Sequence, residues 1–329
     1  MSLRFARPLR RAFLCLAVAV IPACGKDGPT VPPVQPKPSF VKLQSDPGDY
    51  IGAGRSYEYT NANATISVIS TGIGIQVTIN GDEQWFGEFV LPTAAIQPGT
   101  YTGLTRYPFH DPAKGGLSWV GEGRGCNTLT GSVKVDSIRY MIGGVAMLEM
   151  SFEQHCEGVA AALRGTIHYR ADDASAPTGP VNPPPSNLWA PPPGSVPSTG
   201  NSIYLESPAG DYIGQGQTNL YTTGITVSAN GGRVTVGGGG WVGDFQAMNP
   251  LTQLKPGYYA GLERWPFHNP AKGGLSWSGN GRGCNTLSGW FVVDLVTYTG
   301  NAITALDLRF EQRCEGFMPA LHGAVRWRA

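Results

Sequence analysis

One segment of this chain occurs twice, and the distance between the two copies limits what the chain can fold into. Residues 98–136 and 256–294 are identical at 28 of their 39 aligned positions, at a constant offset of 158 residues. A second block repeats at the same offset, at 152–158 and 310–316. Solenoid repeats are only about 20–50 residues long. The longer period therefore predicts two duplicated domains of about 130 residues, each large enough to bury its own core.

The N-terminal segment has the features of an export signal. Four arginines precede a short apolar run at 13–21, which is too short to span a bilayer. The run ends in Ile-Pro-Ala-Cys at 21–24, which resembles the lipobox of bacterial lipoproteins. This resemblance implies cleavage before Cys24, lipid on that cysteine, and attachment to a membrane of the bacterial cell envelope. Gly25 follows the cysteine, as in lipoproteins sent on to the outer membrane or cell surface. The alternative is an ordinary secretory signal.

The charge of the chain excludes one class of partner. The whole sequence has 24 basic and 23 acidic residues, and removal of the four signal arginines leaves 20 against 23, a net charge of −3. Without a long basic run, the chain lacks the electrostatic footprint of a nucleic-acid-binding protein. No later apolar stretch approaches the length of a membrane span. Membrane contact is therefore expected through the N-terminal lipid.

Four cysteines remain beyond the signal and the lipidation site. They are Cys126, Cys156, Cys284 and Cys314, and four cysteines allow three pairings. The duplication selects Cys126–Cys156 and Cys284–Cys314, because each domain should close its own bridge. The alternative is a metal site, but there is no C-x-x-C pair, and no histidine pair keeps ligand spacing in both copies. We expect two disulfides, export to an oxidising compartment, and neither metal nor cofactor.

Proline-rich stretches divide the chain. We expect a signal peptide at 1–23, a tether at 24–39, a first module at 40–170, a linker at 171–200 and a second module at 201–329. Such proline-rich sequence is typically extended and solvated. Trp189, within the linker, either docks onto a module or is exposed.

Both modules are predicted to be all-β. Helical periodicity is absent, glycine is abundant, and short alternating runs dominate. The clearest strand is 146–156, where apolar residues, Gln154 and Cys156 share one face. Asn80-Gly81 and Asn230-Gly231 are typical hairpin turns. Roughly eight to ten short strands per module favour two tandem β-sandwiches, either jelly-roll or immunoglobulin-like.

The best candidate ligand site is the loop-rich segment shared by the two modules. Its polar and aromatic residues are retained after duplication, although loops drift more readily than cores. Aromatic rings stack on sugar faces, while arginine, asparagine and histidine bond hydroxyl groups. The candidate residues are Arg106, His110, Trp119, Arg124 and Asn127 in module one, and Arg264, His268, Trp277, Arg282 and Asn285 in module two.

Each candidate also has a structural interpretation. The tryptophans fit core positions beside the disulfide, as in immunoglobulin-like sandwiches. The arginines fit ion pairs with Glu153 or Glu157, or with their counterparts in module two. Glu153 and Glu157 are unsuited to glycosidase chemistry, because strand residues four apart are separated by about 13 Å. No other catalytic set is evident, so we identify no catalytic residues.

The repeat resembles uncharacterised segments of secreted bacterial proteins with endings like L-R-F-E-Q-x-C-E-G, which implies only an extracytoplasmic module. The leading hypothesis is a lipid-anchored binding protein for polysaccharide or another surface polymer. Two equivalent weak sites would gain avidity on a repetitive ligand. One alternative is a surface scaffold or adhesin that self-assembles through exposed sheet edges. A secreted hydrolase is the other, and the oligomeric state is left open.

Overall fold

The computed structural model describes residues 37–329, and every regular element in that range is a β-strand. Ten strands form module one and ten form module two, which confirms the all-β prediction and its strand count. The predicted signal peptide, Cys24 and the tether up to residue 36 lie outside the described residues.

In module one the strands form a single sheet with the order β2-β1-β10-β9-β8-β6-β7-β5-β4-β3. Their bounds are β1 Phe40–Ser45, β2 Ser56–Thr60, β3 Thr65–Ser70, β4 Ile75–Asn80, β5 Gln84–Val90, β6 Gly99–Arg106, β7 Gly116–Gly121, β8 Leu129–Met141, β9 Gly144–Cys156 and β10 Leu163–Arg170.

Module two repeats this order as β12-β11-β20-β19-β18-β16-β17-β15-β14-β13. Its strands are β11 Ser202–Glu206, β12 Thr218–Tyr221, β13 Thr226–Asn230, β14 Arg233–Gly238, β15 Trp241–Gln246, β16 Gly257–Arg264, β17 Gly274–Gly279, β18 Leu287–Thr299, β19 Ala302–Cys314 and β20 Leu321–Arg328. The duplication seen in the sequence is therefore a duplication of the whole sheet.

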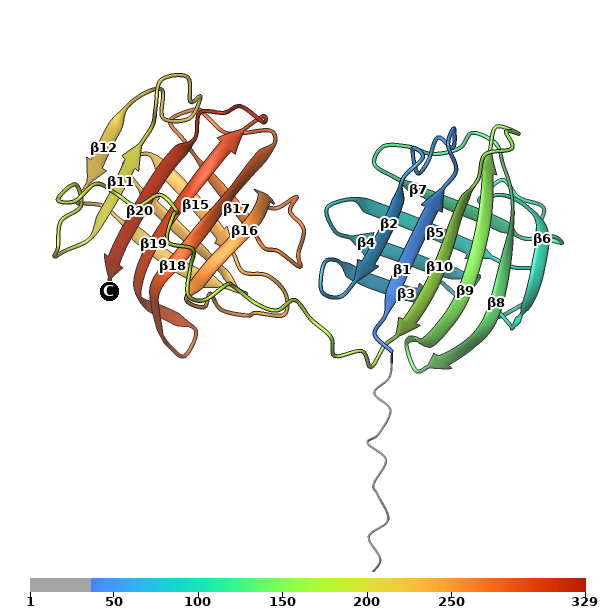
Figure 1. Ribbon diagram of the computed structural model, residues 1–329. Helices are drawn as coiled ribbons and strands as arrows, with labels where there is room; N and C mark the ends of the chain where they lie inside the picture. The colour runs from blue at the N-terminus through green and yellow to red at the C-terminus, as the bar shows by residue number, and fades with distance from the viewer. Residues whose placement is uncertain (1–36) are drawn as a thin grey trace, which may run out of the picture. The chain divides into compact units, whose positions relative to one another are not determined.

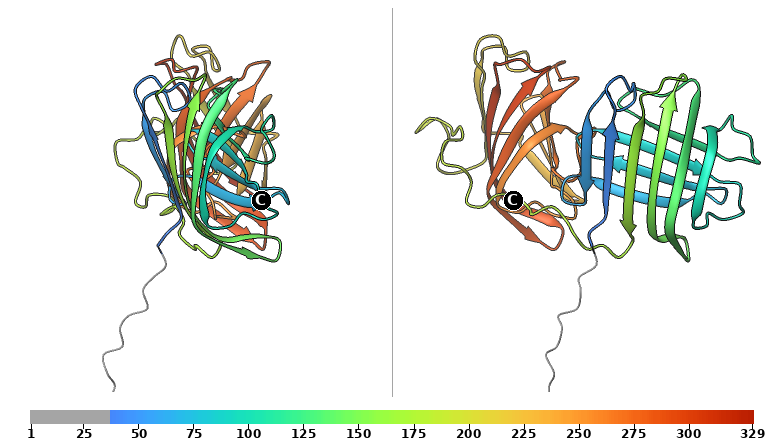
Figure 2. Two further views of the ribbon diagram at one scale, coloured as in Figure 1. Left: turned by 90° about the vertical axis from the view of Figure 1, so that its right-hand side faces the viewer. Right: turned by 45° about the vertical axis from the view of Figure 1, so that its right-hand side comes forward.

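Each sheet folds over on itself where β6 meets β7, or β16 meets β17. These strands pair in parallel over only two residue pairs, whereas the other neighbours are antiparallel. The strands from β2 to β6 in the sheet order form one layer, and β7, β5, β4 and β3 run across them in a second layer (Figures 1 and 2). Each module is therefore a sandwich or barrel-like closure of one sheet.

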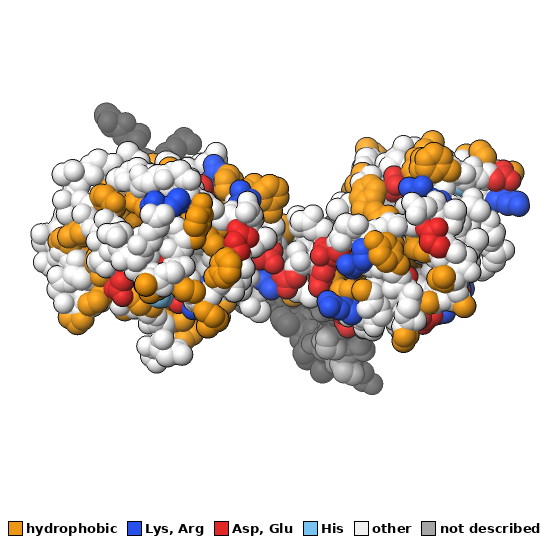
Figure 3. Space-filling view, turned by 90° about the horizontal axis from the view of Figure 1, so that it is seen from above, with side chains coloured by type: hydrophobic (Ala, Val, Ile, Leu, Met, Phe, Trp, Pro, Cys, Tyr) orange, Lys and Arg blue, Asp and Glu red, His pale blue; other side chains and the backbone are white. Residues whose placement is uncertain are grey.

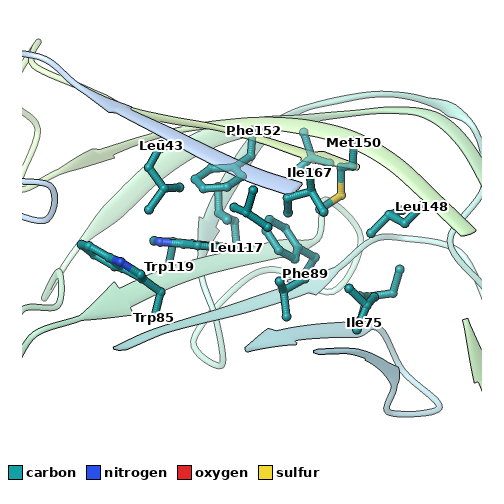
Figure 4. Packing of buried hydrophobic residues seen from close by; sticks show 14 of the residues in the cluster. Leu43, Ile75, Trp85, Phe89, Leu117, Trp119, Leu148, Met150, Phe152 and Ile167 are labelled. Atoms are coloured by element: carbon teal, nitrogen blue, oxygen red, sulfur yellow. The ribbon is translucent and has the colours of Figure 1, made fainter. Parts of the chain in front are cut away.

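The core of module one lies between these layers, as the period-2 pattern requires. Trp119 from β7 packs against Phe152 from β9 with ring centroids 4.8 Å apart (Figure 4). Glycines make room for both rings. An added Cβ would lie 2.4 Å from Trp119 at Gly87 and 2.0 Å from Phe152 at Gly165. Of the face predicted to be buried in β9, Leu148, Met150, Phe152, Gln154 and Cys156 are buried, whereas Ala146 near the start of the strand is only half-buried.

A buried glutamine joins the two layers in each module. The Gln154 side chain accepts a hydrogen bond from the Trp119 backbone N–H at 3.0 Å and donates one to the Trp119 carbonyl at 2.8 Å. Gln312 makes the same two bonds to Trp277, both at 2.8 Å. The amide thus replaces a missing strand neighbour, and it satisfies backbone groups that are costly to leave unpaired.

Replacing Gln154 with leucine is expected to destabilise module one by about 2–3 kcal/mol, because it leaves a buried N–H and a buried carbonyl without partners. The midpoint of urea unfolding of module one measures the effect. Gln84→Leu, at an exposed position, is the control and should change stability by less than about 0.5 kcal/mol. Equal effects of the two substitutions would contradict this role of Gln154.

Two details of the expected hairpins need correction. Asn230-Gly231 does begin the turn between β13 and β14, where Asn230 pairs with Arg233. Asn80 instead ends β4 and pairs with Gln84 across the three-residue loop that Gly81 begins. The two dipeptides therefore lie in different hairpins of the fold, Asn230-Gly231 between β13 and β14 and Asn80-Gly81 between β4 and β5.

The proline-rich linker packs on module two. Val181 forms an isolated bridge with Tyr258, through hydrogen bonds of 3.0 and 2.9 Å. The Trp189 ring stacks on the His322 ring at 4.9 Å and lies nearly parallel to the Tyr204 ring at 6.4 Å. Of the two alternatives for Trp189, docking on a module is the one observed. Figure 1 shows the linker crossing the layer that contains β18, β19 and β20.

Candidate ligand surface at one end of each module

Four loops of module one gather at the same end of the sheet. Strand register requires this: Ser45 pairs with Leu163, Leu129 with Cys156, and Thr105 with Thr130. We call this the loop end, and Figure 1 shows it at the top of module one. Its loops are 46–55, 107–115, 122–128 and 157–162, with counterparts at 207–217, 265–273, 280–286 and 315–320 in module two.

A disulfide lies at each loop end. Cys126 bonds Cys156 and Cys284 bonds Cys314, with Cα atoms 5.1 and 5.0 Å apart. This confirms the predicted pairing. Each bridge joins the loop after β7 or β17 to the end of β9 or β19. Disulfides persist in oxidising compartments, so they support the expected extracytoplasmic location.

Arg124 and Arg282 hold a neighbouring loop in place. The Arg124 Nε donates to the Ile51 carbonyl at 2.7 Å, and the Arg282 Nε donates to the Ile213 carbonyl at 2.7 Å. Each guanidinium also lies over a buried tryptophan, 5.9 Å from Trp85 in module one and 5.3 Å from the equivalent ring in module two. Neither arginine forms an ion pair within the described residues, so the expected pairing with Glu153 or Glu157 and their counterparts is not observed. Their role is to position the loop.

The carboxylates of the repeated F-E-Q-x-C-E-G block also have structural partners. Glu157 accepts hydrogen bonds from the Asn127 backbone N–H at 2.5 Å and the Thr128 hydroxyl at 3.1 Å. Glu153 pairs with Arg164 at 2.7 Å and His155 at 3.1 Å. Both groups are therefore engaged in holding loops and strands together.

These bonds predict acid sensitivity at the loop ends. Hydrogen bonds from the backbone N–H of Asn127 and Asn285 lower the pKa of Glu157 and Glu315 below the usual value of 4.5. A group with a lowered folded-state pKa stabilises the fold above its unfolded pKa and loses that contribution as pH falls through the folded pKa. We expect Tm to fall more steeply below about pH 4.5 in the natural chain than in an E157Q/E315Q variant. Parallel Tm profiles would contradict this.

The tryptophans of the predicted site lie in the core, and its histidines are only partly exposed. Trp119 and Trp277 are 0 % and 1 % exposed, so the core alternative describes them and a ligand cannot reach their rings. The His110 ring is half-buried over Gly116, where an added Cβ would lie 2.6 Å from it, and His268 lies over Gly274 in the same way. Burial lowers the pKa of His268. Both histidines shape the loop from within.

Arg106 and Phe109 differ from these residues, because the Phe109 ring is openly exposed. The Arg106 guanidinium donates to the Asn127 carbonyl at 3.3 Å and lies 5.1 Å from the centre of the Phe109 ring. Phe109 itself is 76 % exposed. Module two repeats the arrangement, with Arg264 at 5.2 Å from Phe267, which is 65 % exposed. A large apolar ring is thus held at the surface beside a cation in both copies.

A second exposed ring at each loop end escaped the sequence comparison. The block G-D-Y-I-G-x-G occurs at 48–54 and 210–216, an offset of 162 rather than 158. Asp49 is buried and accepts hydrogen bonds from the Gly52 N–H at 2.8 Å and the Ser45 hydroxyl at 2.7 Å. This shapes the loop, and Tyr50 next to it is more than half exposed, like Tyr212 in module two. A search that allowed a gap in the offset would have found this block.

Retained residues at each loop end, with exposed tyrosine, phenylalanine and asparagine side chains beside a half-buried arginine, define what we call the loop-end surface. Arg124 bonds the residue next to Tyr50, and Arg106 bonds Asn127, three residues after Arg124. The side chains therefore belong to one connected group of loops. The loop-end surface comprises Tyr50, Arg106, Phe109 and Asn127 in module one, and Tyr212, Arg264, Phe267 and Asn285 in module two.

Outside the loop-end surface, module one has an open cavity of about 510 Å³ whose lining includes Lys42, Tyr57 and Arg164. Within residues 37–329, no cluster of three histidine, cysteine or acidic side chains has the geometry to hold a metal ion. In the same range, no helix is long and apolar enough to cross a membrane. Seen from above, apolar side chains are exposed in separate small groups between polar surface (Figure 3). Comparison of the chain with protein-family models, with curated proteins and with solved structures finds no match.

Proposed function

We propose that this is a lipid-anchored extracytoplasmic binding protein that recognises polysaccharide or another surface polymer through its two loop-end surfaces. The observation that carries the proposal is the exposed phenylalanine beside an arginine in both modules. Core packing does not require Phe109 or Phe267, since most of each ring is in solvent. Retained exposed aromatic residues on loops are typical of binding sites.

The chemistry of the surface suits a sugar polymer. The faces of the Phe109 and Tyr50 rings can stack on the C–H faces of pyranose rings, which are apolar. Arg106 has five N–H donors, and one of them is used by the Asn127 carbonyl. The remaining donors and the exposed Asn127 amide are available to hydroxyl groups. Open loops rather than a deep pocket also suit a long chain that passes across the surface.

Two copies of the surface in one chain suit a repetitive ligand. Linking two weak sites raises avidity by about 10²–10⁴ without any new contact, provided that both can engage at once. The lipobox-like sequence at Cys24 would hold the protein at the bacterial cell envelope, in the outer membrane or at the cell surface. The two disulfides support a location outside the cytoplasm.

The proposal is tested by screening the soluble chain against a glycan array and insoluble cell-wall polymers. An R106A/R264A variant should lose most of the binding, because it removes both the hydrogen-bond donors and the cation beside each exposed ring. The control is K42A, which changes an exposed cation on strand β1, outside the loop end. Binding that survives R106A/R264A unchanged would show that the ligand contacts another surface.

A further inference from the structure

The tip of the β8–β9 hairpin is the most exposed apolar group in module one. Ile142 is 101 % exposed and Met141 is 54 % exposed. Met141 ends β8 and pairs with Gly144, and Ile142 lies in the turn between them. Isolated exposed apolar residues are common, but two adjacent ones at the end of 13-residue strands form a projecting apolar tip.

Module two has the same hairpin with a different tip. Its strands β18 and β19 are also 13 residues long, and Thr299, Gly300 and Asn301 occupy the positions of Met141, Ile142 and Gly143. The apolar tip is therefore not required to build the hairpin.

The two hairpins share a tyrosine directly before the tip, and it contacts the same neighbouring loop in both modules. The Tyr140 hydroxyl donates to the Ile96 carbonyl at 3.3 Å, and the Tyr298 hydroxyl accepts from the Leu254 N–H at 3.2 Å. Both tyrosines tie the hairpin to the same neighbouring loop. The tyrosine is structural in both modules, whereas the methionine and isoleucine are present only in module one.

The tip lies at the end of module one where the chain enters from its N-terminus. Phe40 at the start of β1 pairs with His168, and Arg170 at the end of β10 pairs with Met147 of the hairpin. Figure 1 shows the β8–β9 turn and the start of β1 at the same end, opposite the loop end. Fifteen residues lie between Cys24 and Phe40, and such a segment spans no more than about 60 Å.

We propose that the Met141–Ile142 tip of module one inserts into the interfacial region of a lipid bilayer. This inference rests on the proposed lipid anchor at Cys24, which would keep the tip near the membrane. The loop-end surface of module one would then face away from the membrane. Module two, further along the chain, has the polar tip. The charges around this end of module one are balanced, with Lys37, Arg139 and Arg170 against Glu149, Asp172 and Asp173, so apolar insertion rather than attraction to anionic lipid supplies the affinity.

The test uses the chain without its first 24 residues, which keeps both sheets and both disulfides. Its partition onto neutral phosphatidylcholine vesicles is measured by co-sedimentation at millimolar lipid. The variant M141T/I142G/G143N gives module one the tip sequence that the equivalent hairpin of module two already carries. We expect the partition coefficient to fall by about tenfold or more, and to change little with salt or anionic lipid. I142L, which keeps the apolar bulk, should bind like the natural chain.

A second measurement places the tip directly. In the acylated protein on vesicles, an environment-sensitive fluorophore at I142C should shift to shorter emission wavelengths, and the same label at G300C should not. Equal vesicle binding by the natural and grafted chains, or no binding by either, would overturn the proposal. Dimers in sedimentation that disappear with the graft, without vesicle binding, would instead assign the tip to self-association. Glycan binding by the grafted chain should be unchanged, so failure here is separate from failure of the proposed function.

Discussion

Replacing Gly165 with valine in β10 is expected to unfold module one and leave module two folded. A Cβ at this position would lie 2.0 Å from the Phe152 ring. Phe152 cannot move away, because it packs against Trp119 at 4.8 Å and Phe89 at 5.5 Å within the closed core. Overpacking typically costs about 1–3 kcal/mol and occasionally more, and a clash of 2.0 Å with a fixed ring belongs at the upper end.

Hydrogen exchange followed by peptide mass spectrometry reports on each module separately. In G165V, peptides of module one should exchange at unfolded rates, whereas peptides of module two should keep their protection, since the two cores share no residue. The control is G144V, because nothing lies within 4 Å of an added Cβ at Gly144. Protection of module one that persists in G165V would mean that the β9–β10 packing differs from the one described.

Removing the bridge of module one by C126A/C156A is expected to destabilise that module by roughly 3–4 kcal/mol. The bridge connects residues separated by 30 positions, and in the chain-entropy model a loop of this length loses that much unfolded-state freedom. The bridge also holds the loop after β7, which contains Cys126. This loop carries Arg124, which bonds the Ile51 carbonyl, and Asn127 of the loop-end surface. Ligand binding at module one should therefore weaken along with stability.

Thermal unfolding with and without reductant distinguishes the contributions of the two bridges to the stability of their modules. In the natural chain, reductant should lower the transitions of both modules. In C126A/C156A, the module-one transition should already be low, and reductant should move only that of module two. A transition of module one that is unaffected by C126A/C156A would show that its folding does not depend on the bridge.

The strands were predictable because their signal is local. Alternation between buried and exposed positions is visible along one strand, as in β9, and it placed Phe152, Gln154 and Cys156 on the core side. The duplication added information that a single copy lacks, since it selected one disulfide pairing out of three. Sandwich or barrel-like closure follows from the number of strands and their two-faced pattern.

The roles of the candidate site residues were less predictable, because they depend on contacts between distant segments. The alternating pattern of β9 predicts that Gln154 faces the core. Its bonds to Trp119 exist only because β7 crosses β9 in the other layer. The partner of Arg124 is a backbone carbonyl 73 positions away in the chain, and carbonyls leave no mark in a sequence. Retention after duplication therefore singled out one segment, but it did not separate buried Trp119 from exposed Phe109.

The most direct test of the proposed binding surface is the affinity of four chains for one polymer selected by the glycan screen: the natural chain, F109A, F267A and F109A/F267A. If both exposed rings bind the polymer, each single variant should lose the avidity gain of about 10²–10⁴ and bind as a one-site protein. The double variant should lose binding altogether, while its melting remains that of the natural chain. Undiminished affinity in F109A/F267A would contradict the assignment of the loop-end surface as the ligand site.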